Sequence, residues 1–468
     1  GVDPKAELWK LPSQFVGPYA EMDARLAFDL YKFFKLEIAK QDLNTVWDLE
    51  TRLTPCLIDM TFRGIRVDMD RCERTKQALI KREKAVLKKI EAQAGGEVEI
   101  WAAASLAKAF DKLDIKYPRT ATGQPSFTKS FLSDNPHEFA KMVVEARNLN
   151  KVQGTFVSSI MRYVSKEGRI HGHINQLRSD DGGTVSGRLS MSNPNLQQIP
   201  ARDPELGPMI RSLFLPEEDE QWAAIDFSQQ EPRILVHYAQ IFGQWKSRPL
   251  GGAQDFVDAY NDDPDTDFHS MVAEMAQIPR KQAKTINLGM MYGMGVNKLA
   301  DQLDVDVDTA KEITKQYHNR VPFVKELMSG VSRAVDQKDD GSIRSLKGRK
   351  CRFDMFEPLG YELKKALPKK EARAEYGDTT PLRRAFTYKA LNRLIQASAA
   401  DMTKQAMVDL YEAGERPLLQ VHDELGCSVR DLEHAKKIRE VMEGAIKLQV
   451  PNKCDIDLGP SWGEAVEV

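Results

Sequence analysis

The chain of 468 residues lacks several features that would mark particular protein classes. Its five cysteines are scattered and form no C-x-x-C pair, so nothing points to a zinc site or a redox couple. Its net charge is only −2, so a polyanion would have to be bound by local basic surfaces. No apolar run approaches the roughly 18 residues of a membrane span, and no internal repeat is visible. We therefore expect a cytoplasmic protein without a membrane partner, and neither a solenoid nor a propeller.

The composition is that of an ordinary globular protein, with 41% hydrophobic and 29% charged residues. At roughly 150 residues per domain, the length predicts about three domains. The chain starts with Gly-Val-Asp-Pro, without an initiator Met or a signal peptide. We therefore expect a fragment of a longer protein.

Apolar spacing predicts several helices before any chemistry is considered. Residues 19–40 carry Leu26, Leu30 and Phe33 on one face, and residues 53–63 read as a helix that Gly64 ends before a short strand. Residues 70–92 form a strongly charged amphipathic helix. Its basic face is either simply solvated or lies along a phosphate backbone. Loop residues at 117–125 and 178–187 could separate subdomains.

Two acidic segments follow apolar, strand-like runs. In WAAIDFSQQEPR (residues 222–233), the run ends at Asp226. In LLQVHDELGCSV (residues 418–429), His422-Asp423-Glu424 separates two such runs, as in a tight hairpin. If Asp226 and Asp423 are neighbours, a pair of Mg²⁺ ions about 4 Å apart would offset their repulsion and suit displacement at phosphorus. Taken alone, the second segment is more typical of a solvated hairpin tip, and a separation of 197 residues leaves the pairing open.

A third segment, RKQAKTINLGMMYGM (residues 280–294), predicts a helix with an unusual stripe. Residues four apart form one face that runs from cationic to apolar to aromatic: Arg280, Lys284, Leu288 and Tyr292. Such a stripe can place two cations on a triphosphate and an apolar surface under a base. The alternative is an amphipathic helix with a charged start. Cations at a helix N-terminus oppose the dipole, and Gly289 costs about 1 kcal/mol relative to Ala, which favours a functional site.

The three segments, in this order, resemble motifs A, B and C of the family A DNA polymerases, the bacterial DNA polymerase I family. Their patterns read DYSQIELR, RxxxKxxxF/YGxxYG and QVHDE. Residues 184–200 are similar to the family's TGRLSSxxPNLQNIP segment, and Asn392 with residues 396–401 is similar to its NxxxQGxAAD helix. The stretch around residues 177–187 looks most like the phage-encoded branch. The resemblance covers nearly the whole chain.

The resemblance implies an α+β fold in the shape of a right hand, with an antiparallel-sheet palm and helical thumb and fingers. The implied parts are the tail of a 3′–5′ exonuclease domain (1–42), palm (43–74, 186–240 with motif A, and 386–468 with motif C), thumb (75–185) and fingers with the motif B helix (241–385). The implied function is a DNA-directed DNA polymerase, a nucleotidyltransferase of phage or bacterial DNA replication. Primer-template DNA and dNTPs would be its partners, and the chain would act as a monomer, with accessory replication proteins left open.

The resemblance also implies roles for single residues. Asp226, Asp423 and the carbonyl of Phe227 would hold two Mg²⁺ ions, with Glu424 in support. Lys284 would donate a proton to the pyrophosphate leaving group, and Glu231 would exclude the ribose 2′-OH. The implied nucleotide-binding residues are Arg280, Lys284, Leu288, Tyr292, His269, Glu231 and Gln229. The implied DNA contacts are Arg188, Asn195, Gln197, Gln396, Gln420, His422, Asn392 and Arg233.

Three departures from the family pattern concern the nucleotide site. Leu288 replaces an aromatic residue, Gln230 an Ile and Pro232 a Leu. None of these is an implied metal ligand, so they bear on nucleotide discrimination and not on the reaction.

Near the N-terminus, Tyr19 and Asp23 fit the Tyr-x-x-x-Asp element that ends the family's exonuclease domain. The other metal ligands of that domain are absent from this chain, so we expect no exonuclease activity. Two alternatives to a DNA polymerase are a single-subunit RNA polymerase, which Glu231 argues against, and a DNA-binding remnant. The latter should have lost Asp226, Asp423, Arg280 or Lys284, and all four are present.

Overall fold

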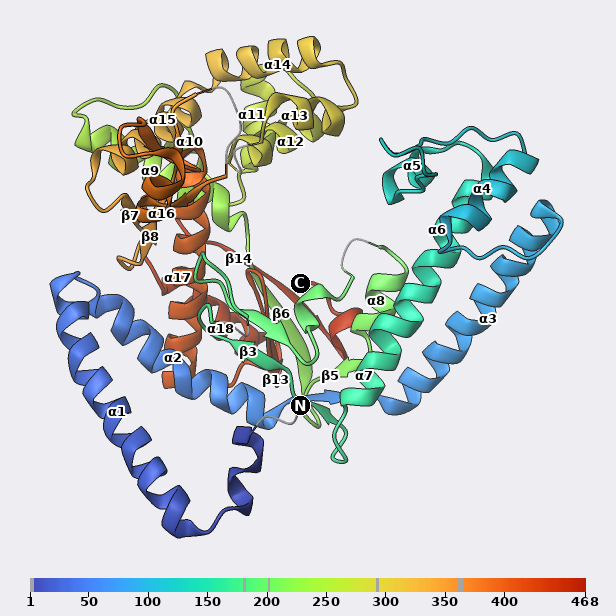
Figure 1. Ribbon diagram of the computed structural model, residues 1–468, viewed down its shortest axis with the longest axis horizontal. Helices are drawn as coiled ribbons and strands as arrows, with labels where there is room; N and C mark the ends of the chain where they lie inside the picture. Colours follow the sequence, from blue (N-terminus) through green and yellow to red (C-terminus); the bar gives the residue numbers. More distant parts are fainter. Residues whose placement is uncertain (1–3, 180–181, 201–202, 292–293, 361–364) are drawn as a thin grey trace. The chain divides into compact units, whose positions relative to one another are not determined.

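The computed structural model describes residues 4–179, 182–200, 203–291, 294–360 and 365–468. The chain divides into two compact units (Figure 1). Unit 1 comprises residues 1–54 and 231–405, and unit 2 comprises residues 55–230 and 406–468. Helices and antiparallel sheets occur in both, which confirms the α+β class expected from the sequence.

Unit 2 contains a central antiparallel sheet of order β12-β13-β6-β14-β15. Its strands are β6 (Gln221–Phe227), β12 (Leu419–Val421), β13 (Glu424–Val429), β14 (Cys454–Gly459) and β15 (Val466–Glu467). Strand β6 lies in the middle and its interior residues are buried, as a strand covered on both faces requires. Trp222 stacks on Trp462 with ring centroids 5.9 Å apart. A Cβ at Gly426, on the neighbouring strand, would come within 2.6 Å of the Trp222 ring, so only glycine fits there.

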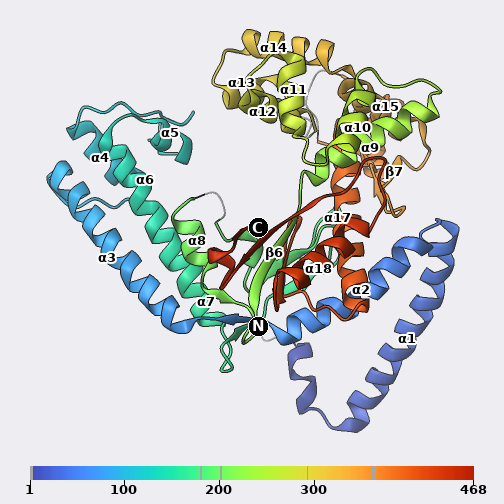
Figure 2. The same ribbon diagram turned by 180° about the vertical axis from the view of Figure 1, so that it is seen from behind.

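The other elements of unit 2 are mostly helical. Helix α3 packs lengthwise on α6 in both views (Figure 2). Asp68 caps the start of α3 by accepting from the Arg71 N–H (2.7 Å), and Gly95 ends it in a left-handed conformation. Its Val86 and Ile90 are buried while its charged residues face outward, so the expected amphipathic helix is confirmed. The elements are β1 (Ile65–Val67), α3 (Met69–Ala94), α4 (Ala103–Lys112), α5 (Lys129–Asp134), α6 (Glu138–Lys151), the π-helical η2 (Val152–Val157), α7 (Ser158–Tyr163), β2 (Arg169–Ile170), β3 (His173–Asn175), β4 (Ser190–Ser192), η3 (Leu196–Gln198), α8 (Leu206–Arg211), β5 (Phe214–Leu215), α18 (Leu432–Gly444) and η5 (Trp462–Glu464).

Unit 1 is dominated by helices, with two small sheets, β7-β8 and β10-β9-β11. Helix α12 packs on α11, and α13 on α14. The elements that begin in this unit are η1 (Pro4–Lys10), α1 (Ser13–Lys40), α2 (Asn44–Arg63), α10 (Ala253–Asp262), α11 (Phe268–Ala276), α12 (Arg280–Met291), α13 (Val296–Leu303), α14 (Val307–Arg320), α15 (Pro322–Gln337), β7 (Ser342–Arg344), β8 (Lys350–Arg352), β9 (Met355–Pro358), β10 (Leu367–Pro368), α16 (Lys369–Tyr376), β11 (Leu382–Arg384), η4 (Thr387–Lys389) and α17 (Ala390–Glu412). Helix α9 (Gln230–Trp245) starts at the boundary between the units.

Helix α1 differs in burial from a typical amphipathic helix. It starts at Ser13, earlier than the expected 19, and contains no buried residue. The apolar residues that predicted it are exposed, at 52% for Leu26, 54% for Leu30 and 58% for Phe33. The apolar spacing therefore predicted the helix correctly, but its apolar face has no core to cover in the described chain.

All five cysteines are free and buried. Among the helices of the described chain, none combines the length and the hydropathy that crossing a bilayer requires.

Candidate active site

Asp226 and Asp423 lie at neighbouring positions of the central sheet of unit 2. Asp226 is the penultimate residue of β6, and Asp423 belongs to the two-residue turn between β12 and β13, where Val421 pairs with Glu424. The turn is tight because His422 adopts a left-handed conformation (φ 58°). The Phe227 N–H donates to the Asp423 backbone carbonyl (3.3 Å). The predicted strand end and the predicted hairpin are therefore both confirmed, and they meet.

Further carboxylates surround Asp226. Glu424 on β13 and Asp455 on β14 lie directly opposite it on the two flanking strands. The Asp226 side chain reaches solvent, but protein atoms surround much of its carboxylate. This burial, followed by repulsion from Asp423, raises its pKa to about 8. Such repulsion is relieved when a cation sits between the carboxylates.

The donor set fits a magnesium ion. It consists only of oxygen atoms, which Mg²⁺ prefers, and Mg²⁺ is commonly held by one or two carboxylates together with water and substrate phosphates. Within the described residues, no group of three or more His, Cys, Asp or Glu side chains is arranged to hold an ion. A divalent cation here would therefore need oxygen atoms from a substrate or from water to complete its coordination.

Glu424 is fixed by two residues that the sequence did not single out for this role. Its Oε1 accepts from the Trp462 indole N–H (2.8 Å), and its Oε2 lies 3.9 Å from the Arg211 guanidinium. Arg211 itself lies over the Trp462 ring. Burial raises the pKa of Glu424, and the charge of Arg211 opposes this. Glu424 is thus a positioned carboxylate beside the pair.

Asp455 is a third residue that sequence reasoning missed. Its carboxylate lies 3.1 Å from the Lys453 ammonium, so its charge has a local partner. Only the register of β14 against β6 reveals its position next to Asp226, and no sequence spacing signals it.

The predicted cationic stripe is present on helix α12 of unit 1. Arg280 and Lys284 are exposed and Leu288 is half-buried, whereas Ala283, Ile286 and other residues of the opposite face are buried. Arg280 forms an ion pair with Asp267, which lowers the pKa of that carboxyl although burial opposes the shift. Tyr292, the predicted aromatic end of the stripe, lies outside the described residues.

His269 is largely buried. It is 8% exposed, and its Nδ1 lies 3.0 Å from the Asn287 side-chain amide. The Oδ1 of Asn287 accepts from the Tyr317 hydroxyl (2.7 Å), so the ring is held by a buried chain of hydrogen bonds. Burial lowers the pKa of His269. Asn287 and Tyr317 are further residues that the sequence did not mark.

The residues before and within the start of α9 show mixed accessibility. Gln229 has a left-handed backbone (φ 52°), and Glu231 is half-buried within the first turn of the helix. Gln230 is 4% exposed. Arg233 is 2% exposed, lies over the Tyr260 ring and donates to the Pro264 carbonyl (2.6 Å). The structure therefore places Arg233 in the interior of unit 1, and we leave it out of the proposed contacts.

The candidate DNA contacts fall into two groups. In unit 2, the Gln197 amide donates to the Gln420 Oε1 (2.9 Å), and Gln420 donates to the His422 carbonyl (2.5 Å). Asn195 caps η3, and Arg188 is half-buried. In unit 1, two half-buried amide side chains four residues apart lie on α17: Asn392 and Gln396.

Comparison with known proteins agrees with this geometry. Residues 69–464 match the family described as DNA polymerase family A. The chain is 35% identical to the DNA-directed DNA polymerase of Pseudomonas phage M6, over 100% of this chain and 73% of that protein. It is 32% identical to DNA polymerase I of Geobacillus stearothermophilus, over 89% of this chain and 46% of that protein.

Among solved structures, the POL domain of Pol1 from M. smegmatis, in complex with DNA primer-template and dNTP, is similar with a TM-score of 0.75. The two share 27% identity, over 93% of this chain and 74% of that chain. This likeness confirms the polymerase fold expected from the resemblance. The chain belongs to DNA polymerase family A and is a DNA-directed DNA polymerase.

Proposed function

We propose that this chain extends the 3′-OH of a primer with dNTPs by nucleotidyl transfer assisted by two divalent cations. The observation that carries the proposal is the meeting of Asp226 and Asp423 at one end of the central strand pair, where repulsion favours a cation. Asp226, Asp423 and the Phe227 carbonyl would hold two Mg²⁺ ions. When bound, such ions would activate the attacking oxygen and neutralise charge on the leaving group.

The residues of the chain would bind and orient the reactants. Arg280 and Lys284, on the exposed face of α12, would neutralise the triphosphate. Lys284 would give up a proton to the leaving pyrophosphate, as a general acid. His269 would act at the rim of the phosphate site, held by Asn287.

The nucleotide's base and sugar would be read by other residues of the same region. Leu288 and Tyr292 would face the base, and Gln229 would assist in nucleotide binding. Glu231 would exclude a ribose 2′-OH by its bulk and charge.

Primer-template DNA would be the macromolecular partner. The linked amides of Gln197 and Gln420 are suited to minor-groove acceptors, whose positions depend little on sequence. The other proposed contacts are Arg188, Asn195, His422, Asn392 and Gln396. We assign the palm to residues 43–74, 186–240 and 386–468, the thumb to 75–185 and the fingers to 241–385, and we expect a monomer.

Primer extension on a defined template tests the proposal. With dNTPs and Mg²⁺ the chain should extend the primer, and with EDTA or with rNTPs in place of dNTPs it should not. Efficient extension with rNTPs would indicate an RNA polymerase, and DNA binding without extension would indicate a non-catalytic protein.

We further propose that these 468 residues do not excise a mispaired 3′ end. The expected exonuclease element contributes Tyr19 and Asp23, and Asp23 raises the pKa of the Tyr19 hydroxyl through a side-chain hydrogen bond. A mispaired primer incubated with Mg²⁺ and no dNTPs should stay intact; shortening that persists in Asp226→Asn would show a separate nuclease.

A further inference from the structure

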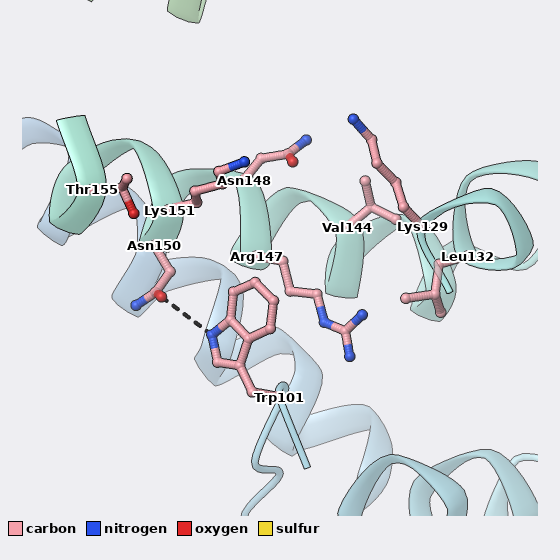
Figure 3. Close-up of a pocket in the computed structure, with 9 residues that line it drawn as sticks. All are labelled: Trp101, Lys129, Leu132, Val144, Arg147, Asn148, Asn150, Lys151 and Thr155. Atoms are coloured by element: carbon pink, nitrogen blue, oxygen red, sulfur yellow. Dashed lines mark hydrogen bonds between the residues drawn. The ribbon is translucent and has the colours of Figure 1, made fainter. Parts of the chain in front are cut away.

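A pocket of about 560 Å³ lies in unit 2, where the loop before α4 meets α5 and α6. We call it the Trp101 pocket (Figure 3). It is lined by Trp101, Lys129, Leu132, Val144, Arg147, Asn148, Asn150, Lys151 and Thr155. In both views α4 and α5 lie at the end of α6 away from the central sheet, so this pocket is separate from the carboxylate pair (Figures 1 and 2).

The pocket offers a fixed aromatic ring. Trp101 is 57% exposed, so much of its side chain can be reached from solvent. Its indole N–H donates to the Asn150 Oδ1 (3.2 Å), and the Arg147 guanidinium lies 5.0 Å from the ring centroid. The ring is therefore held in one orientation while much of its surface stays open.

Arg147 also holds the walls of the pocket together. Its Nε donates to the Ile100 carbonyl (2.8 Å) and its Nη1 to the Phe127 carbonyl (3.0 Å). These bonds tie the segments that carry Trp101 and Lys129 to helix α6. The pocket is thus preformed and need not be assembled by a ligand.

The charge of the lining is of one sign. Lys129, Arg147 and Lys151 are cationic, and none of the nine lining residues is acidic. The Glu83 carboxylate accepts from the amide of the lining residue Asn150 (2.8 Å). In Figure 3 the amino groups of Lys129 and Lys151 point away from the indole, whereas the Arg147 guanidinium lies beside it.

The backbone at this place is irregular as well. Helix α6 passes directly into the π-helical segment η2, and Thr155 of that segment lines the pocket. π-Helical turns are rare and occur frequently at functional sites. This is a feature of the fold that is independent of the side-chain chemistry.

We infer that the Trp101 pocket binds one unpaired nucleotide, with its base stacked on the Trp101 indole and its phosphate at Lys129 and Lys151. An aromatic platform beside cations is how single-stranded nucleic acids are bound. The volume lies in the range of small-ligand pockets. The amide of Asn148 supplies hydrogen-bonding groups of the kind that base edges require. The nucleotide comes either from a single strand, such as an unpaired template segment, or from free nucleotide.

The test compares binding of labelled single-stranded dT12 and of a labelled blunt duplex to the full chain by fluorescence anisotropy. Trp101→Leu should weaken dT12 binding about 5- to 150-fold, and Trp101→Phe, which keeps a stacking ring, should weaken it much less. Lys129→Ala with Lys151→Ala should reduce the steepness of log K against log salt concentration by about 0.7, the value for one phosphate contact on a single strand. Lys108→Ala, an exposed lysine of α4 outside the pocket, is the matched control and should have no effect. Duplex affinity should stay within about 2-fold in every variant.

Photocrosslinking keeps the inference testable if other sites on the chain also bind dT12. An oligonucleotide with 5-iododeoxyuridine should crosslink to Trp101, as mapped by mass spectrometry. Competition by free dTMP that is lost in Trp101→Leu would identify free nucleotide as a ligand, and competition by oligonucleotide alone would identify a strand. Three results would overturn the inference. They are unchanged dT12 binding in both pocket variants, crosslinks that all map to other residues, and a loss of duplex affinity as large as the loss of dT12 affinity.

Discussion

The backbone N–H of Phe227 donates a 3.3 Å hydrogen bond to the backbone carbonyl of Asp423. This bond joins the end of β6 to the turn after β12. Two carboxylates almost 200 residues apart in the sequence therefore lie at the same end of the sheet. A rigid strand and a tight turn hold them, which is the support that a catalytic site requires.

Shortening the proposed sugar gate should relax sugar selection. Glu231→Ala removes a half-buried side chain at the start of α9, so ribonucleotides should be incorporated more readily. The measurement is kcat/KM for a matched rNTP and dNTP pair. An unchanged ratio would remove Glu231 from sugar selection, and Glu231→Gln, which keeps the bulk, shows how much of the effect comes from charge.

Leu288 should make the polymerase discriminate strongly against dideoxynucleotides. It offers no hydroxyl that could stand in for a missing sugar 3′-OH. Leu288→Tyr should relax discrimination by about one hydrogen bond, on the order of 1–3 kcal/mol or 5- to 150-fold. Leu288→Phe restores the flat face without the hydroxyl and should change turnover more than sugar selectivity.

The check is single-nucleotide kcat/KM for dNTP and ddNTP with all three proteins. Equal use of both nucleotides by the unaltered chain would contradict this role for Leu288. So would identical behaviour of the Tyr and Phe variants.

Acid should destabilise unit 1 through His237. Burial lowers the pKa of this α9 residue to about 4, from an ordinary value near 6.5. Between these values the unfolded chain binds a proton that the folded chain does not, so the free energy of unfolding falls as pH drops from about 6.5 to 4. The loss between pH 7 and pH 5 is about 2 kcal/mol.

Denaturant titrations at pH 7 and pH 5 measure this difference. It should shrink in His237→Gln, which cannot take up the proton. A difference of the same size in that variant would assign the acid sensitivity to other groups.

A buried ionic cluster in unit 1 should show strong coupling. The Lys404 ammonium lies 2.8 Å from Glu50, and Arg349 forms ion pairs with Glu50 and Asp401. Lys404→Met leaves excess negative charge buried and should cost about 3–5 kcal/mol of stability. Glu50→Gln combined with Lys404→Met leaves the Arg349–Asp401 pair and should cost clearly less than the sum of the single variants. Additive losses in this double-mutant cycle would show that the cluster does not act as a unit.

The sequence predicted those parts of the site that local patterns encode. Three such patterns are visible in short stretches of sequence: an apolar run that ends in Asp226, a turn at Asp423 between two apolar runs, and the i, i+4 stripe of α12. The structure contains the corresponding strand, turn and helix. The resemblance then supplied the expectation that these segments act together.

The contacts that hold the site were not predictable in this way. Arg211 and Trp462 reach Glu424 from other parts of the chain, and Asn287 reaches His269 from the next helix. Asp455 becomes a neighbour of Asp226 only through strand register. Such relationships depend on tertiary packing, which leaves no period in the sequence. Helix α1 shows the opposite situation. Its apolar residues recur with a clear helical period, yet none of them is buried in the structure.

Extension of a primer by one nucleotide, with Mg²⁺, tests the central claim most directly. Asp226→Asn and Asp423→Asn should each lower kcat at least about 100-fold, while primer-template affinity stays within about 3-fold because dispersed phosphate contacts supply it. Asp455→Asn is the matched control, since its carboxylate pairs with Lys453, and it should retain most of the activity. Two results would contradict the assignment of the two carboxylates as the metal-holding pair. One is substantial turnover in Asp226→Asn or Asp423→Asn, and the other is a loss of turnover in Asp455→Asn as large as in those two variants.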